Sequence, residues 1–319
     1  MEKLKVGVIG AGFFAEKHLE VLTALEDVEV GALCSRGHPR IRALAERFNI
    51  ARTFSNLDQM FDEVKPDAVF VLVNVGRMVS VVSECLRRRV PTLIEKPPGL
   101  SAAEARALRD LAAAQNCMNM VGLNRRFYSV MQRAREAILE VGPLVSVLVE
   151  APERLWEYKT GAHPPEVVAG LLFANGIHSI DLLRYFGGDV ELVHALASQW
   201  NEEQKNSFGA LMRFEGGAMG QYIANWMSPG GWSVTLYGMD RRVLLKPLER
   251  GLLFDRSGAE TELPVDETDV KYKPGLYAQD RYFLDCVREG RAPSYPAADL
   301  ADAAKTMELI EAIAGGGLR

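Results

Sequence analysis

The stretch Lys5-Val6-Gly7-Val8-Ile9-Gly10-Ala11-Gly12-Phe13-Phe14-Ala15 decides the fold of this chain. A run of strand-forming residues leads into two glycines separated by one residue, and a helical pattern begins at Glu16. Gly10 permits a tight turn, Gly12 lets the backbone approach a pyrophosphate, and Ala15 is small enough for the helix to pack on the strand. The N-terminus of that helix would present free N–H groups and a partial positive charge. The stretch therefore predicts a strand, turn and helix that bind a dinucleotide.

The residues after the second expected strand, 28–34, bear on the choice of cofactor. An acidic side chain there, about twenty residues beyond the glycines, would hold the ribose 2′-hydroxyl of NAD. The sequence instead continues Ser35-Arg36-Gly37-His38-Pro39-Arg40, which offers cations to a 2′-phosphate and no carboxylate to repel it. NADP(H) is therefore favoured, and the alternative is a solvated basic loop beside bound NAD(H).

Strands alternate with helices through the first 123 residues. Strand patterns follow at 68–73, 92–94 and 118–121, and helical patterns lie at 40–48, 55–61, 79–88 and 101–115. This alternation predicts an α/β fold with a doubly wound parallel (Rossmann) sheet, whose ligand lies at the carboxyl ends of the strands. Gly12, Ser35, Asn74 and Lys96 all fall at those ends.

From residue 124 the pattern changes. A helix at 128–140 and a strand at 144–150 precede a Pro-rich loop that holds Trp156, Tyr158, Lys159 and His163. A helix at 176–185 is followed by strand-like segments at 190–198, 207–214, 218–227 and 232–237, and the chain ends in helices at 276–288 and 298–313. Closely spaced strands without helices between them predict an α+β domain with a large, mostly antiparallel open sheet. The expected domains are 1–123, which binds the dinucleotide, and 124–319, which binds substrate and forms oligomers.

Composition excludes several classes of protein. The length of 319 residues favours two domains, and 48% hydrophobic with 25% charged residues is typical of a globular protein. A net charge of −5 gives no support for binding nucleic acid or an anionic membrane. The four cysteines lack metal-ligand spacing, and no run reaches the roughly 18 to 20 apolar residues of a membrane span. We therefore expect a cytoplasmic protein without a signal peptide, a metal, a nucleic-acid partner or a membrane.

Two side chains could carry acid–base chemistry. Lys96 follows the strand 92–94, where the nicotinamide is expected, and a lysine there can exchange a proton with a hydroxyl or carbonyl. The alternative is a surface lysine in a turn. His178 shares a helix face with Asp181 and could relay protons or hold a substrate hydroxyl. A structural histidine at a domain interface is the alternative.

Five motifs together resemble one family. They are Gly10-Ala11-Gly12, Glu95-Lys96-Pro97, Asn124-Arg125-Arg126-Phe127, Gly176-Ile177-His178-Ser179-Ile180-Asp181 and Tyr237-Gly238. In order and spacing they resemble the glucose-fructose oxidoreductase, inositol dehydrogenase and MocA (Gfo/Idh/MocA) family over essentially the whole chain. The resemblance implies an NAD(P)-dependent dehydrogenase or reductase of a sugar, cyclitol or related polyol, with Lys96 and His178 as catalytic residues. It also implies that the second domain is an oligomer interface, and we expect a homodimer or homotetramer.

The sequence departs from the family at two motifs. Members commonly have D-x-G-x-H, whereas Ala174 takes the place of the aspartate. The common T-P-N-x-x-H is replaced by Leu72-Val73-Asn74-Val75-Gly76-Arg77. These departures leave a second hypothesis open, a dinucleotide-sensing regulator without turnover on the same fold.

The expected sites are assigned residue by residue. The expected cofactor-binding residues are Gly10, Gly12, Phe13, Phe14, Ser35, Arg36, Asn74, Glu95, Lys96 and Arg126. The expected substrate-binding residues are Lys96, Asn124, Trp156, Tyr158, Asn175 and His178. Arg77 and the loop cations hint at an anionic substrate such as a sugar acid, with a solvated basic face as the alternative.

Overall fold

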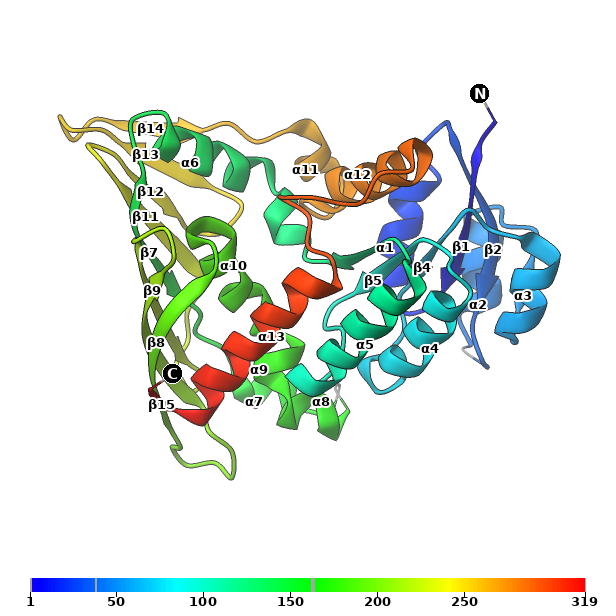
Figure 1. Ribbon diagram of the computed structural model, residues 1–319, viewed down its shortest axis with the longest axis horizontal. Coiled ribbons are helices and arrows are strands. Elements are labelled where there is room, and N and C mark those ends of the chain that lie inside the picture. The colour runs from blue at the N-terminus through cyan, green and yellow to red at the C-terminus, as the bar shows by residue number, and fades with distance from the viewer. Residues whose placement is uncertain (1, 38, 162–163, 319) are drawn as a thin grey trace. The chain divides into compact units, whose positions relative to one another are not determined.

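A computed structural model describes residues 2–37, 39–161 and 164–318 (Figure 1). The chain divides into two compact units. The first comprises Met1–Asn124 and Thr268–Ala304, and the second comprises Arg125–Glu267 and Lys305–Arg319. His38 and His163 lie outside the described residues.

The first unit contains a six-stranded sheet in the order β3-β2-β1-β4-β5-β6, and every pairing in it is parallel. Its strands are β1 (Leu4–Ile9), β2 (Val28–Cys34), β3 (Thr53–Phe54), β4 (Ala68–Val71), β5 (Thr92–Glu95) and β6 (Asn119–Gly122). Every residue of β4 is buried, because helices cover both faces of a sheet of this type. The strand order reverses between β1 and β4, which is where such sheets bind their ligands. The predicted doubly wound fold is confirmed.

Helices connect these strands: α1 (Phe13–Leu22), α2 (Ile41–Arg47), α3 (Leu57–Val64), α4 (Val75–Arg87) and α5 (Ala102–Gln115). The Ser101 hydroxyl accepts a hydrogen bond from the backbone N–H of Glu104, and the Glu104 carboxylate accepts one from Leu100, so α5 begins with the expected cap. The helix α4 begins at Val75, four residues before the predicted start, because Val75 and Gly76 are poor helix formers that hide its first turn.

A segment near the C-terminus belongs to the first unit. It carries α11 (Glu267–Lys271) and α12 (Leu276–Glu289), and Val121 of β6 pairs with Ala298. The sequence-based boundary places all of 124–319 in one domain, whereas Thr268–Ala304 lies with the first unit. The hydrophobic pattern of a helix does not specify which sheet the helix covers, so this arrangement has no local signal.

The second unit contains a nine-stranded sheet in the order β14-β13-β12-β11-β7-β10-β9-β8-β15. Only β7 and β10 pair in parallel, which confirms the predicted, mostly antiparallel open sheet. Its strands are β7 (Leu144–Glu150), β8 (Val190–Ser198), β9 (Ser207–Phe214), β10 (Met219–Asn225), β11 (Ser233–Gly238), β12 (Arg242–Leu245), β13 (Gly251–Phe254), β14 (Glu260–Leu263) and β15 (Gly317–Leu318). The short strands β12, β13 and β14 were not predicted.

The helical elements of the second unit are the 3₁₀ turn η1 (Asn124–Phe127), which begins on the last residue of the first unit, and α6 (Ser129–Leu139), α7 (Leu155–Tyr158), α8 (Pro165–Ala169), α9 (Leu171–Ala174), α10 (Ile177–Gly187) and α13 (Leu300–Gly315). The first residues of α13 belong to the first unit. Three short helices, α7, α8 and α9, occupy the region that the sequence predicts to be a Pro-rich loop. Each spans four or five residues, which is too few to produce a hydrophobic period.

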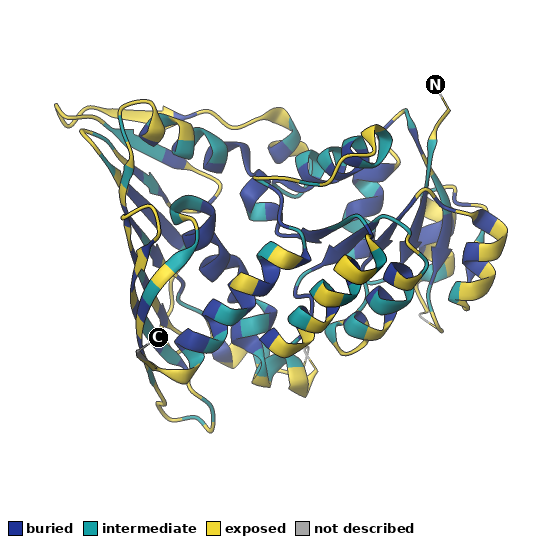
Figure 2. Cartoon of the chain, in the orientation of Figure 1, coloured by how far each residue is buried: buried dark blue, intermediate teal, exposed yellow. Residues whose placement is uncertain are grey.

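One face of the nine-stranded sheet is buried and the other is exposed. On β9 the side chains of Phe208, Ala210 and Met212 are buried, whereas Leu211 is 61% exposed. The helices α6 and α10 pack against strands of this sheet, and nine of the eleven residues of α10 are buried (Figure 2). A sheet with one covered face produces this alternation.

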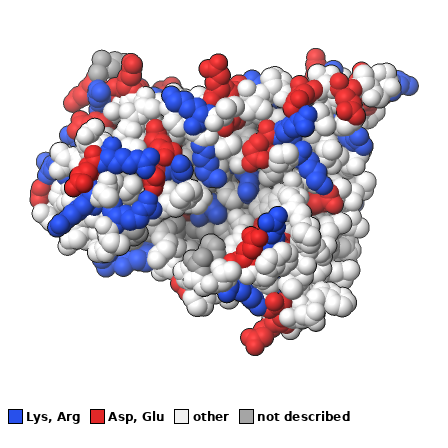
Figure 3. All heavy atoms as spheres, turned by 180° about the vertical axis from the view of Figure 1, so that it is seen from behind, with Lys and Arg blue, Asp and Glu red and all other residues white. Residues whose placement is uncertain are grey.

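Charges of both signs are distributed over the surface. Lys and Arg side chains are interspersed with Asp and Glu on the face seen in Figure 3. No helix among the described residues is long and apolar enough to cross a membrane.

Candidate functional site

The glycine turn after β1 is shaped by two different requirements. Gly10 has φ +128°, and a Cβ there would lie 2.2 Å from the Leu72 carbonyl oxygen, so only glycine fits. Gly12 precedes α1, and a Cβ there would meet no described heavy atom within 4 Å. The backbone at Gly12 is therefore open to a ligand, and the first N–H groups of α1 have no partner within their own helix. These features fit the diphosphate of a dinucleotide.

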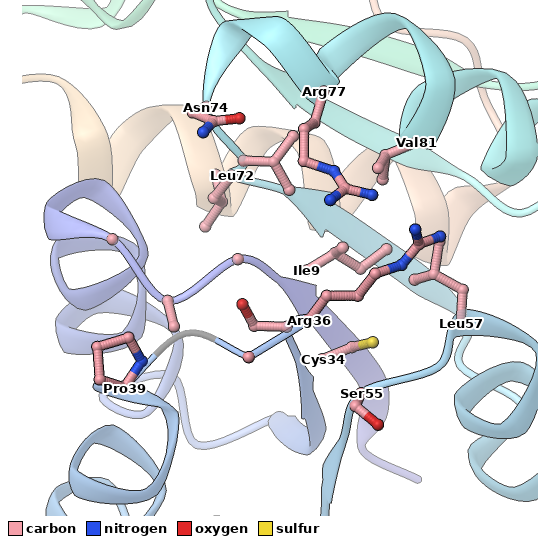
Figure 4. A pocket seen from close by; sticks show the side chains of 16 residues that line it. Ile9, Cys34, Arg36, Pro39, Ser55, Leu57, Leu72, Asn74, Arg77 and Val81 are labelled. Atoms are coloured by element: carbon pink, nitrogen blue, oxygen red, sulfur yellow. The ribbon is translucent and has the colours of Figure 1, made fainter. Parts of the chain in front are cut away.

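A cavity of about 400 Å³ opens beside this turn (Figure 4). It lies at the carboxyl ends of β1, β2 and β4, as predicted for the ligand of a doubly wound sheet. Its lining residues are Ile9, Gly10, Ala11, Gly12, Cys34, Ser35, Arg36, Gly37, Pro39, Ser55, Leu57, Leu72, Val73, Asn74, Arg77 and Val81. The predicted cofactor residues Gly10, Gly12, Ser35, Arg36 and Asn74 are thus brought together in one place.

The charge of this pocket is positive. Arg36 comes from the end of β2 and Arg77 from the first turn of α4, and both side chains extend into the pocket (Figure 4). The described lining contains no carboxylate. Arg77 therefore lies at the predicted cofactor site, a placement that the sequence reading did not anticipate. The sequence feature that could have predicted this placement is the position of Arg77, three residues after Asn74 at the end of a strand.

Lys96 follows β5 and lies near the first turn of α1. Its Nζ is 5.9 Å from the centroid of the Phe14 ring, and the Lys273 Nζ is 5.6 Å from the same centroid. Lys96 is half-buried, and the Lys96–Pro97 peptide bond is cis. Phe13, the preceding residue of α1, is 59% exposed. The first unit therefore places two ammonium groups over one aromatic ring at the edge that carries the dinucleotide turn.

Behind this edge lies a buried cluster that the sequence did not reveal. The His18 Nδ1 atom is 2.8 Å from Asp280 Oδ2, and its Nε2 is 3.7 Å from Glu95 Oε2. Burial alone would lower the pKa of His18, but Asp280 and Glu95 outweigh it and raise the pKa to about 9. The cluster joins α1, α12 and the end of β5. It gives Glu95, a predicted cofactor residue, a charged partner inside the protein.

In the second unit, Arg126 forms a buried ion pair. Its Nε and Nη2 donate to the two carboxylate oxygens of Asp181 at 2.7 and 2.6 Å. The Thr306 hydroxyl donates to the same carboxylate at 2.9 Å. His178 lies on the first turn of α10 and is 6% exposed. Asp181, the expected helix-face neighbour of His178, thus holds η1, α10 and α13 together.

A polar cluster lies beside the start of α10. The Asn175 Nδ2 donates to Glu153 Oε1 at 2.6 Å and to the Tyr158 hydroxyl at 3.0 Å. The Tyr158 hydroxyl lies 3.5 Å from Glu153 Oε2. Two predicted substrate residues, Tyr158 and Asn175, are thus brought together with Glu153, which no sequence pattern marked.

Three other residues that the sequence singled out make contacts or have exposures of their own. Asn124, in the first unit, donates through Nδ2 to the Pro274 carbonyl at 2.9 Å. Trp156 is 44% exposed on α7. Lys159 pairs with Glu202. No group of three or more His, Cys, Asp or Glu residues among the described ranges is arranged to hold a metal ion.

The fold and the glycine turn define a dinucleotide-binding protein of the Rossmann type. Residues 4–123 match the family model described as "Oxidoreductase family, NAD-binding Rossmann fold" (GFO_IDH_MocA), and residues 132–243 match the "GFO/IDH/MocA C-terminal domain". The chain belongs to the Gfo/Idh/MocA oxidoreductase family. The resemblance read from its motifs is confirmed.

Individual relatives are distant but of similar length. The chain is 23% identical to trans-1,2-dihydrobenzene-1,2-diol dehydrogenase of Mus musculus, over 97% of this chain and 95% of that protein. It is 26% identical to D-apiose dehydrogenase of Rhizobium rhizogenes (strain K84), over 64% and 60% of the two chains. The crystal structure of levoglucosan dehydrogenase with NADH and L-sorbose superposes with a TM-score of 0.84 at 17% identity, over 98% of this chain and 96% of that chain. This last likeness concerns the fold.

Proposed function

We propose that this NAD(P)-dependent oxidoreductase interconverts a hydroxyl and a carbonyl group on a sugar, a cyclitol or a sugar derivative. The observation that carries the proposal is the open dinucleotide turn at the strand edge that also carries Lys96. The names of two relatives, a D-apiose dehydrogenase and a dihydrodiol dehydrogenase, support a polyhydroxylated substrate.

The residues of the chain divide the work between binding and proton transfer. The turn at Gly10 and Gly12, with the N-terminus of α1, holds the diphosphate, and the bound nicotinamide supplies the hydride acceptor or donor. Lys96 takes the hydroxyl proton at Nζ during oxidation and returns it during reduction. His178 orients the reacting oxygen or assists this proton transfer. Asn124, Trp156, Tyr158 and Asn175 contribute further contacts to the substrate.

Substitution of Lys96 tests the proposal. Lys96→Ala is expected to lower kcat by about 10²- to 10⁴-fold, the usual contribution of a general acid or base, while NADPH binding measured by fluorescence is retained. Lys3→Ala, which removes an exposed lysine of the same unit, is the control and keeps full turnover. Wild-type protein that binds NADPH but oxidises no member of a panel of sugars, cyclitols and sugar acids would overturn the enzyme assignment. It would then favour a dinucleotide-sensing regulator.

We further propose that NADP(H) is the preferred cofactor. Arg36, Arg77 and the Ser35 hydroxyl line the pocket where the ribose 2′-phosphate would lie, with no carboxylate in the described lining. A charge-assisted hydrogen bond contributes about 1.5–3 kcal/mol, or roughly 10- to 100-fold in affinity. Arg36→Ala and Arg77→Ala should each weaken NADPH binding by about this factor and leave NADH binding nearly unchanged.

The same titration includes two further variants. Ser35→Asp should weaken NADPH binding and strengthen NADH binding, because a carboxylate repels the phosphate and accepts a bond from the 2′-hydroxyl. Arg42→Ala, an exposed arginine of α2 outside the pocket lining, is the matched control. A wild-type preference for NADH would overturn the NADP assignment and leave the dinucleotide site in place.

We also propose that the protein forms a homodimer or homotetramer through the exposed face of the nine-stranded sheet. Leu196, Leu211, Met219 and Ile223 are 46% to 80% exposed on neighbouring strands. Leu211 of β9 lies opposite Gln221 of β10 and opposite His194 of β8. Met219, Gln221 and Ile223 are every second residue of β10, so their side chains lie on the same face of the sheet as Leu211. Apolar side chains gathered on one sheet face are typical of an interaction surface.

A further inference from the structure

Glu153 lies between β7 and α7 and receives hydrogen bonds on both of its carboxylate oxygens. Asn175 precedes α10 and donates to Oε1 at 2.6 Å. Tyr158, at the end of α7, donates to Oε2 over 3.5 Å, and the Trp232 side chain, just before β11, is close enough to lower the pKa of this carboxyl. The Glu153 side chain is only partly exposed.

The partly exposed Arg125 contributes a cation to the surroundings of Glu153. The Arg125 guanidinium lies 4.1 Å from the centroid of the Trp232 ring, and its charge acts on Glu153. Its Nη1 atom is buried and has no hydrogen-bond partner among the described residues. A buried N–H group without a partner is costly, which indicates that a ligand atom satisfies it in the working protein.

The hydrogen-bonding capacity of the cluster is incompletely used. An ionised carboxylate offers about four acceptor sites, and the side chains of Asn175 and Tyr158 donate to Glu153. The bond from Tyr158, at 3.5 Å, is at the limit of hydrogen bonding and can be replaced by a closer donor. Asn175 uses its side-chain N–H groups within the cluster, which leaves its side-chain oxygen available to a ligand. The cluster therefore offers a ligand two acceptors, on Glu153 and Asn175, and one donor, on Arg125.

This arrangement suits adjacent hydroxyl groups. Each hydroxyl donates one hydrogen bond and accepts others, so one hydroxyl can donate to Glu153 while a neighbour donates to Asn175 and accepts from Arg125. His178 follows Asn175 by three residues, and the backbone N–H of His178 donates a hydrogen bond to the backbone carbonyl of Asn175. The cluster is therefore attached to the helix start that carries a proposed catalytic residue.

We propose that Glu153 is a further substrate-binding residue, whose carboxylate accepts a hydrogen bond from a vicinal diol and selects substrates that carry one. Arg125 donates to the same diol. This inference rests on the proposed function, because it concerns the substrate of that reaction.

Burial gives the carboxylate a pH dependence that can be measured. Burial raises the pKa of Glu153, and this is the largest effect on the group. The hydrogen bond from Asn175, the charge of Arg125 and the interactions with Trp232 and Tyr158 lower the pKa, but together they do not cancel the effect of burial. Burial raises the pKa of the Tyr222 hydroxyl, and the charge of Glu153 raises it further. Tyr222 therefore stays neutral over the pH range in which Glu153 titrates. Diol binding should therefore weaken as pH falls and Glu153 becomes protonated.

The test compares matched pairs of diols. The NADP(H)-loaded protein is titrated with cis-1,2-cyclohexanediol against cis-1,3-cyclohexanediol and with 1,2-propanediol against 1,3-propanediol, followed by saturation-transfer NMR and by KM with kcat for oxidation. Wild type should prefer the vicinal diol of each pair by at least about tenfold, the value of one hydrogen bond to a charged group. Glu153→Gln should remove this preference and its pH dependence, with the main change in KM.

Two control variants separate binding from folding. Glu157→Gln alters an exposed carboxylate of the adjacent helix α7, where it pairs with Arg154, and this variant should behave as wild type. Glu153→Asp keeps the charge but shortens the side chain, and it should retain the acidic pH dependence with weaker binding. NADPH affinity and the unfolding temperature report the integrity of each variant.

The outcomes distinguish two failures. If wild type binds and oxidises a vicinal diol and Glu153→Gln keeps the preference for it, the assignment of Glu153 is overturned and the proposed function stands. If wild type binds NADPH but neither binds nor oxidises any of the four diols, nor any member of the panel of sugars, cyclitols and sugar acids, the polyol substrate class is overturned, and the role of Glu153 is overturned with it.

Discussion

At the scale of single residues, Gly10 and Gly12 differ in what a side chain would meet. Gly10→Ala places a Cβ against the Leu72 carbonyl in a backbone conformation with φ +128°. We expect a loss of about 2 kcal/mol or more in the free energy of unfolding, from backbone strain and overpacking. Urea unfolding followed by circular dichroism measures this loss. Stability equal to that of wild type would show that the turn can relax.

Gly12→Ala is the matched variant, with a different expected effect. A Cβ at Gly12 meets no described atom within 4 Å, and its φ of −79° suits alanine. Stability should therefore change by less than about 0.5 kcal/mol, as for a substitution without a structural mechanism. In the proposed cofactor site the new methyl group would face the pyrophosphate, so NADPH affinity should fall by at least about tenfold. Unchanged affinity would move the diphosphate away from this turn.

Individual residues also mark the limit of sequence reading. Gly10 was predictable because a turn between strand and helix requires a particular backbone conformation. The place of Arg77 in the pocket and the hydrogen-bond partners of Glu153 were not predictable, because they depend on which loops lie next to one another in the folded protein. The sequence shows that Ala174 takes the place of the aspartate common in the family, so a carboxylate is missing at this position. It does not show that the carboxylate of Glu153 accepts a hydrogen bond from the neighbouring Asn175.

At the scale of elements, a charged cluster fixes α1, α12 and the end of β5. The pKa of His18 is about 9 in the folded protein, compared with about 6.5 in the unfolded chain. Its stabilising effect is thus fully present below about pH 6.5 and is lost as pH rises through about 9. The expected magnitude is of order 3 kcal/mol. Urea unfolding from pH 6 to 9.5 should show this loss in wild type and not in His18→Gln.

His194 provides a control for this experiment. It is exposed on β8 and belongs to the second unit. His194→Gln should therefore follow the wild-type dependence on pH. If His18→Gln and wild type lose stability in parallel across this range, the buried cluster is not the source of the pH effect.

A second element-scale prediction concerns the ion pair that joins η1, α10 and α13. Asp181→Asn leaves the Arg126 guanidinium buried without its counter-charge, and the side chains of both residues are only 3% exposed. Removing one partner of a buried pair costs about 3–5 kcal/mol. Thermal unfolding should reveal a loss of this order. The double variant Arg126→Met with Asp181→Leu should recover much of it, whereas a loss of similar size in the double variant would exclude the buried charge as its cause.

At the scale of the whole molecule, the sequence predicted both sheets, because alternation of strands with helices and closely spaced strands are local patterns. It did not assign Thr268–Ala304 to the first unit. That segment is held there by pairs such as His18 with Asp280, which are 262 residues apart. Such contacts form only after both segments have folded onto the same sheet, so no local pattern specifies them.

The exposed face of the nine-stranded sheet yields the last prediction. Leu211→Lys with Ile223→Lys should convert the assembly into monomers, because two buried charges would face the partner's sheet. Both side chains are exposed in the single chain, at 61% and 46%, so the monomer itself should remain folded. Light scattering after size-exclusion chromatography measures the mass. Val270→Lys, at a 78% exposed position of α11, is the control and keeps the wild-type mass. A monomeric wild type, or unchanged mass in the double variant, would place the contact elsewhere or remove it.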